Sequence, residues 1–96
     1  MELVKKIEII TNSLELPRVL KILEKAGVSG YTIIENVTGT GDRGRVINDL
    51  ATQALTNGYV MSICTEKEHQ LVKAIEPVLK KFGGVCIVSD AKWIAH

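Results

Sequence analysis

Aromatic residues are scarce in this sequence, so rings cannot make up most of its core. Only four of the 96 residues are aromatic, whereas 46% of the chain is hydrophobic. The core is therefore expected to consist mainly of isoleucine, valine and leucine. A chain this apolar is not expected to be disordered, and its length matches one domain over residues 1–96. Because a chain of this size has a thin core, oligomerisation would add useful burial.

An excess of charge of one sign is also missing. Twelve basic residues stand against eleven acidic ones, which leaves a net charge of +1. Such a chain has no strong overall field that would draw it to nucleic acid or to an anionic membrane. Nucleic acid is therefore not an expected partner. A few basic groups gathered in one cleft would still bind a small anion.

Residues for metal or acid–base chemistry are few and scattered. Cys64 and Cys86 stand alone in apolar segments, without the CxxC spacing of a redox or zinc site. His69 falls on a polar helix face and His96 is terminal, so neither is placed as a base or a ligand. The sequence predicts no metal site, no catalytic residues and no enzyme activity. Lone cysteines in apolar surroundings are typical of a reduced, cytoplasmic chain.

Long hydrophobic runs are absent as well. No stretch approaches the roughly 20 apolar residues of a membrane span. Lys5, Lys6 and Glu8 interrupt the first apolar segment, which argues against a signal peptide. The chain is not expected to be a membrane protein, and the cytoplasm is its expected location.

The residues that are present alternate between strand and helix patterns. Runs rich in β-branched residues predict four strands, over Val4–Thr11, Gly30–Val37, Gly58–Cys64 and Val85–Ser89. Apolar residues at helical spacing predict two helices, over Leu16–Ala26 and Thr65–Phe82. This β-α-β-β-α-β order is typical of an α+β, ferredoxin-like sandwich, in which both helices cover one face of a single antiparallel sheet. The other face would meet solvent or a partner.

Proline and glycine mark the ends of the helices. Pro17 suits a first helical turn, and Gly27 suits a left-handed stop after the first helix. Pro77 lies inside the second helix and is expected to kink or shorten it. Gly83 and Gly84 are expected to end that helix.

A twenty-residue segment, 38–57, separates the second and third strands. Connections of this length inside a small domain are usually functional or disordered. Residues 46–55 within it are weakly helical in pattern. The alternative is a tolerated surface insertion without a role.

Two glycine-containing turns are candidate anion sites. The first opens the long segment with Gly39, Thr40, Gly41, Asp42, Arg43 and Arg45. Glycine lets backbone amides approach an oxyanion, and arginine binds phosphate or carboxylate in bidentate fashion. The alternative is a flexible turn with solvated arginines. The second turn, Gly83–Gly84, follows Lys80 and Lys81, and its alternative is a helix end with lysines that offset the helix dipole.

These residues carry a family resemblance. The run Gly27–Glu35, followed by Gly39–Gly41, resembles the signature of PII signal-transduction proteins, and the glycine pair before the last strand matches as well. The stretches 37–44 and 82–93 are most similar to the PII-like branch associated with inorganic-carbon uptake and carboxysomes. The resemblance covers nearly the whole chain.

The resemblance implies a homotrimer that binds an adenine nucleotide, as an effector and not as a cofactor, in clefts between subunits. Segment 38–57 would be the T-loop, which docks on a protein target such as a transporter or a carbon-uptake complex. The implied nucleotide contacts are apolar residues around the adenine, a threonine from the neighbouring chain, the base of the loop and the phosphate-side turn: Ile10, Ile63, Thr32, Gly39, Thr40, Gly41, Asp42, Arg43, Gly83 and Gly84. Bicarbonate is a further implied ligand, with Arg43 and Arg45 as its candidate partners.

The sequence also departs from the family pattern. No tyrosine lies between Thr38 and Asn57, so the uridylylated tyrosine of some members has no counterpart. The paired C-terminal arginines that hold a triphosphate are missing too, which favours ADP or AMP over ATP. Two other interpretations remain open: a trimeric metal-tolerance protein of the CutA type, which the sparse His and Cys disfavour, and a small ferredoxin-like phosphatase, for which Asn12 lacks a nearby arginine.

Overall fold

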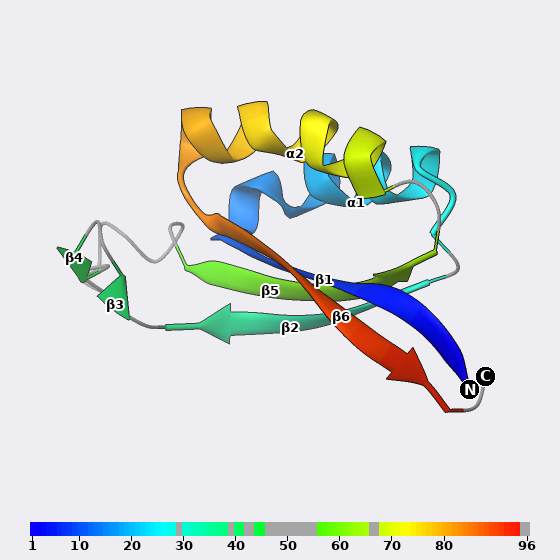
Figure 1. The fold of residues 1–96 in the computed structure, drawn as a ribbon. Helices are drawn as coiled ribbons and strands as arrows, with labels where there is room; N and C mark the ends of the chain where they lie inside the picture. Colours follow the sequence, from blue (N-terminus) through cyan, green and yellow to red (C-terminus); the bar gives the residue numbers. More distant parts are fainter. Residues whose placement is uncertain (29, 39, 42–43, 46–55, 66–67, 95–96) are drawn as a thin grey trace.

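The computed structural model describes residues 1–28, 30–38, 40–41, 44–45, 56–65 and 68–94. Four long strands and two helices alternate in the predicted order (Figure 1). Their bounds are β1 (Glu2–Asn12), α1 (Leu16–Lys25), β2 (Tyr31–Val37), β5 (Asn57–Cys64), α2 (Glu68–Phe82) and β6 (Val85–Trp93). A 3-10 turn, Ser13–Glu15, joins β1 to α1. A small hairpin of β3 (Thr40–Gly41) and β4 (Gly44–Arg45) falls inside the predicted loop, where the sequence pattern indicated no strand.

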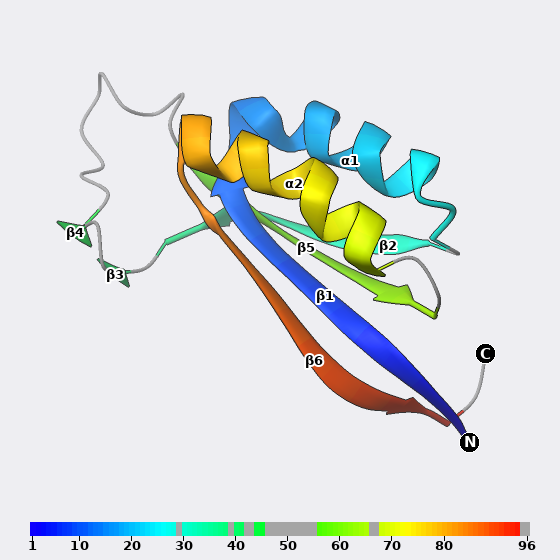
Figure 2. The same ribbon diagram turned by 45° about the horizontal axis from the view of Figure 1, so that its top comes forward.

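The four long strands form one antiparallel sheet in the order β2-β5-β1-β6. Both helices cover the same face of this sheet (Figure 2). The predicted α+β, ferredoxin-like arrangement is therefore confirmed. Strand β6 continues four residues past its predicted end, because its pairing with β1 extends from Val85 opposite Ile10 to Trp93 opposite Glu2.

The core lies between the sheet and the helices, and it is aliphatic as predicted. Ile7, Ile9 and Val60 point from the sheet and are fully buried. Val19 and Leu23 of α1, with Leu71 and Ile75 of α2, belong to the same cluster. Burial of one such side chain stabilises the fold by about 1.5–3 kcal/mol.

The ends of the helices follow the sequence signals, with one exception. Pro17 lies in the first turn of α1, and Gly27 adopts a φ of +76° just after it. Pro77 does not shorten α2, which continues to Phe82. The helix persists because residues beyond the proline still pack on the core: Val78 is buried and Leu79 contacts the cluster. This packing offsets the lost backbone hydrogen bond.

The two cysteines are free thiols on strands that are not neighbours. Cys64 of β5 is buried, whereas Cys86 of β6 is half-buried. Burial raises the pKa of the Cys86 thiol, which keeps it protonated and unreactive at neutral pH. Both residues therefore serve packing.

Candidate functional site

The two glycine-containing turns predicted to bind an anion lie at the same end of the sheet (Figure 1). Val37, where β2 enters the loop, pairs with Asn57, and Asn57 pairs with Asn12 of β1. On the other side of β1, Ile10 pairs with Val85, directly after the second turn. The strands next to the two turns, β2 and β6, stand at opposite edges of the sheet, three strand spacings or roughly 14 Å apart. A ligand held by both would therefore have to bridge that width or lie between two chains.

Gly83 and Gly84 form a turn that requires glycine on steric grounds. Gly83 ends α2 with a hydrogen bond from its N–H to the carbonyl of Leu79 at 2.8 Å. Their φ values are +86° and +123°, which side chains rarely adopt. A Cβ on Gly84 would lie 2.4 Å from the carbonyl oxygen of Ile10 and 3.1 Å from the Cα of Thr11. The turn therefore rests directly on the backbone of β1.

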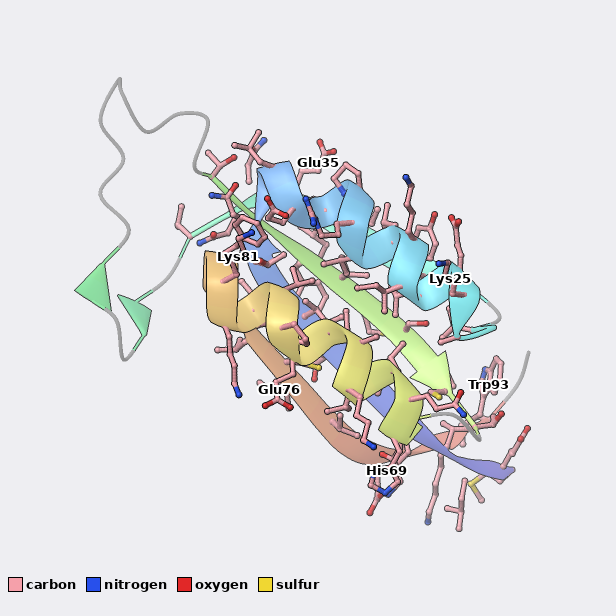
Figure 3. The ribbon with its side chains drawn as sticks, turned by 90° about the horizontal axis from the view of Figure 1, so that it is seen from above. Lys25, Glu35, His69, Glu76, Lys81 and Trp93 are labelled. Atoms are coloured by element: carbon pink, nitrogen blue, oxygen red, sulfur yellow. The ribbon has the colours of Figure 1, made fainter. Side chains whose placement is uncertain are left out.

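Cations surround this turn on the helix side. Lys81 and Arg18 lie 5.3 Å and 5.4 Å from the centroid of the Phe82 ring, and Lys81 projects at the end of α2 (Figure 3). Lys80 is instead paired with Glu76 at 2.9 Å. The C-terminal, negative end of the α2 dipole lies at this turn. Lys80 and Lys81 offset it, in agreement with the alternative interpretation of the turn as a helix end with compensating lysines. Arg18 is also paired, with Glu15 at 3.1 Å, so among the described residues Lys81 is the cation that favours an anion at this turn.

The start of the predicted T-loop is described only in part. Thr40 pairs with Arg45 and Gly41 with Gly44 in the β3–β4 hairpin. These four residues are placed by their backbone. Gly39, Asp42, Arg43 and the weakly helical stretch 46–55 lie outside the described residues, so their predicted roles stay predictions.

The other end of the loop is fastened to the end of β1. The N–H of Ser13 donates to the carbonyl of Thr56 at 2.7 Å. The hydroxyl groups of the same two residues are 3.1 Å apart. Sequence reasoning missed this contact, because nothing in the sequence pairs two hydroxyl residues 43 positions apart.

The strand that enters the loop is bent by a β-bulge. The pairing of β2 with β5 shifts register between Ile34 and Val37. Asn36 has a φ of +58° there, a left-handed conformation in which asparagine is enriched. The bulge turns the strand just before Thr38. The available signal in the sequence is an asparagine near the end of a β-branched run, which alone does not specify a bulge.

Three predicted adenine neighbours lie on the sheet face opposite the helices, here called the outer face. Ile10 and Ile63 are half-buried and Thr32 is exposed. Ile10 of β1 lies opposite Tyr59 of β5, and Ile63 of β5 lies opposite Lys6 of β1. The two isoleucines are therefore offset by four residues along the strand direction, or roughly 13 Å. Thr32 pairs with Met61 between them. In a single chain these three side chains are therefore spread along the sheet and do not form one binding site.

The outer face is strongly apolar and uncovered in the single chain. Ile34, Val85 and Ile87 are 52%, 50% and 52% exposed. Apolar surface of this kind marks an interaction site when it is contiguous. These exposures favour a partner over solvent, the two alternatives that the strand pattern left open.

One polar cluster interrupts the outer face. The hydroxyl of Tyr59 donates to the carboxylate of Glu8 at 2.7 Å, and the ammonium of Lys6 lies 3.6 Å from the same group. The Tyr59 hydrogen bond is the main cause that lowers the pKa of the Glu8 carboxyl, and Glu8 in turn raises the pKa of Tyr59. Because folding lowers the pKa of Glu8, its contribution to stability is present above the unfolded-state pKa and is lost as the pH falls through the folded-state value.

Replacing Tyr59 by phenylalanine is expected to raise the pKa of Glu8 toward its usual value, because the bond to the charged carboxylate is lost. An NMR titration of the Glu8 side-chain carboxyl carbon measures this pKa. Tyr31→Phe is the control, since the hydroxyl of Tyr31 bonds Glu24 of α1 instead. An unchanged Glu8 pKa in Tyr59→Phe would show that the hydrogen bond does not set it.

Metal chemistry finds no support in the described part of the chain, where no group of three or more His, Cys, Asp or Glu side chains could hold an ion. Among the helices of these residues, none is long and apolar enough to cross a membrane.

The architecture defines a class of protein: a small ferredoxin-like domain with a long insertion between β2 and β5 and a glycine turn at the same end of the sheet. The family model of nitrogen regulatory protein P-II matches residues 4–95. The chain therefore belongs to the P-II family, whose members are regulatory signalling proteins and not enzymes. Proteins of this family are typically homotrimers that act on protein targets.

Solved structures agree with this assignment. CPII, a nitrogen regulatory PII-like protein from Thiomonas intermedia K12 bound to ADP, AMP and bicarbonate, matches with a TM-score of 0.80 and 25% identity over 94% of this chain and 87% of that chain. The same protein bound to ADP and bicarbonate matches with a TM-score of 0.80, 27% identity and the same coverage. The B. subtilis GlnK–ATP complex shares the fold, with a TM-score of 0.67 and 20% identity over 93% of this chain and 82% of that chain. A comparison with curated proteins gave no match.

Proposed function

We propose that the chain is a PII-like sensor that binds ADP or AMP, together with bicarbonate, in clefts between the subunits of a homotrimer. The observation that carries the proposal is the placement of the Gly83–Gly84 turn and the base of the long loop at one end of the sheet. CPII, at 25% identity, is bound to ADP, AMP and bicarbonate, which supports the same ligand class here. The T-loop, about residues 38–57, would report the ligand to a protein target.

A trimer would complete the nucleotide site. Ile10 and the Gly83–Gly84 turn of one chain are adjacent, since Gly84 lies against the carbonyl of Ile10. Thr32 and the loop base lie toward the opposite edge, beyond β5. A neighbouring copy that presents its β2 edge to this end would bring Thr32, Gly39–Arg43 and the turn together. The uncovered apolar outer face supplies surface for such assembly.

The choice of nucleotide follows from the cations available. Lys81 lies beside Phe82 at the turn, whereas Arg18 is paired with Glu15 and segment 90–96 contains Lys92 and no arginine. A diphosphate or monophosphate needs fewer cations than a triphosphate, so ADP and AMP are favoured over ATP. Arg43 and Arg45 are the proposed partners of bicarbonate. The proposed target is an inorganic-carbon uptake system, as the resemblance to the carbon-associated branch suggests.

Thermal unfolding with each candidate ligand tests this function. A ligand that binds only the native state raises the free energy of unfolding by about 2.7 kcal/mol at a hundredfold excess over Kd. ADP and AMP are expected to raise the Tm by several degrees, and ATP by less. Bicarbonate added with ADP is expected to raise the Tm further, except in Arg43→Ala and Arg45→Ala. Lys21→Ala, at an exposed position of α1, is the control for lost charge outside the loop. No shift with any adenine nucleotide would reject the proposal.

A further inference from the structure

The end of β1 and the first residue of the 3-10 turn contact the two candidate elements of the site, the glycine turn and the long loop. Thr11 contacts the Gly83–Gly84 turn, and Ser13, two residues later, contacts the end of the loop at Thr56. Residues 11–13 are here called the β1 terminus. Nothing in the sequence pattern singles it out.

The contact with the turn is buried and specific. Thr11 is 1% exposed, and its hydroxyl donates to the carbonyl of Gly83 at 3.0 Å. It is one of two buried polar residues among the described residues, the other being Ser62. Because Gly84 also lies against the backbone of Ile10 and Thr11, the turn cannot shift without disturbing β1. A valine at position 11 would leave the Gly83 carbonyl without this partner.

The contact with the loop uses the backbone and the side chain together. Ser13 holds Thr56 by its N–H, at 2.7 Å, and by its hydroxyl, at 3.1 Å. Asn12, between the two contact residues, pairs with Asn57 and accepts a hydrogen bond from the N–H of Leu14 at 2.8 Å. Each residue of the β1 terminus is thus held by a neighbouring element. A displacement of Thr11 would be transmitted to Ser13, because only Asn12 separates them in the chain.

We propose that the β1 terminus is a positioning element that couples occupancy of the Gly83–Gly84 turn to the attachment of the loop at Thr56. The inference rests on the proposed function, because it takes a nucleotide phosphate as the group bound at the turn. The two-state element is the Ser13–Thr56 contact, which is closed or open. A ligand that favours the closed contact must itself bind more tightly when the contact is closed, by the same factor.

The experiment measures both directions of this coupling with ADP as the probe. The exchange rate of the Ser13 amide, whose N–H donates to Thr56, is followed by NMR with and without saturating ADP. The affinity for ADP is measured by calorimetry. The variants are Thr11→Val, Ser13→Ala and the double variant, with Thr65→Val and Ser89→Ala as matched controls of the same chemistry elsewhere. Thr11→Ser restores the hydroxyl, and melting curves confirm that each variant is folded.

In the unaltered chain, ADP is expected to slow exchange of the Ser13 amide about tenfold. Thr11→Val should still bind ADP but lose most of this slowing, whereas Thr11→Ser should retain it. Ser13→Ala should weaken ADP binding about fivefold on its own and have little further effect in the Thr11→Val background, since coupled residues are not additive.

Three results would overturn the inference. ADP binding without any change in Ser13 amide exchange would show that the turn and the loop attachment are not coupled. The proposed sensor function would remain intact. Full slowing in Thr11→Val, or additive effects of the two variants, would show that the β1 terminus is only structural. Absence of ADP binding to the unaltered chain would reject the proposed function and this inference together.

Discussion

Gly84→Ala is expected to lower the free energy of unfolding by about 3 kcal/mol, because a strained φ and a backbone clash act at the same residue. The φ of Gly84 is +123°, and its new Cβ would approach the Ile10 carbonyl to 2.4 Å. That oxygen belongs to the backbone of a central strand and cannot move away as a side chain would. For a domain of this size, such a loss lowers the Tm by roughly 10 °C or more. The affinity for ADP should fall as well, since the turn would be displaced.

Two other glycines distinguish the two causes of this loss of stability, the strained φ and the backbone clash. Gly27 has a φ of +76°, but a Cβ added there would meet nothing within 4 Å, so Gly27→Ala should cost only the conformational strain, about 1–2 kcal/mol. Gly30 has neither a left-handed φ nor a close neighbour, and Gly30→Ala should change stability by less than about 0.5 kcal/mol. Chemical denaturation of the three variants gives the order. Equal losses for Gly84→Ala and Gly27→Ala would show that the turn is not seated on β1.

Ile87→Lys is expected to abolish the proposed homotrimer while leaving each chain folded. Ile87 lies on the outer face and is 52% exposed in the single chain, so a lysine there disturbs the core of one chain little. In an assembly that covers the outer face, the ammonium would lose its water, and Glu8 opposite it is already engaged by Tyr59 and Lys6, so its burial costs several kcal/mol. Lysine is chosen because position 87 pairs with Glu8, which an aspartate would repel.

Size-exclusion chromatography with light scattering measures the result. At about 10 µM the unaltered chain should elute as a trimer and Ile87→Lys as a monomer, which corresponds to a loss of affinity of at least roughly a hundredfold. Leu14→Lys is the control, because Leu14 is 63% exposed but belongs to the 3-10 turn after β1 and not to the outer face. A trimeric Ile87→Lys would place the contact between copies on another surface.

The fold was predictable because its signals are local. The β-branched runs and the helical spacing of Leu16, Val19 and Leu23 specify element types whatever their neighbours are. The ends of elements were less predictable, since they depend on tertiary contacts. Helix α2 survives Pro77 because Val78 beyond it is buried, and β6 extends to Trp93 because β1 offers it a partner.

The candidate site was predictable only as a set of residue types. Glycine at 83 and 84 indicated a turn, but the reason that position 84 needs glycine is a carbonyl 74 positions earlier in the chain, at Ile10. The bonds of Thr11 to Gly83 and of Ser13 to Thr56 join distant parts of the sequence in the same way. Such contacts depend on strand register, which the pattern of one sequence does not specify. The roles of all the predicted nucleotide and bicarbonate contacts stay predictions.

The central claim is that two copies of this chain enclose a nucleotide phosphate between the Gly83–Gly84 turn of one and the loop base of the other. A crystal structure of the ADP complex tests it most directly. The account predicts three chains around a threefold axis, with each diphosphate in hydrogen-bond reach of residues 83–84 from one chain and residues 39–43 from its neighbour. A monomer, or ADP bound away from both turns, would contradict it.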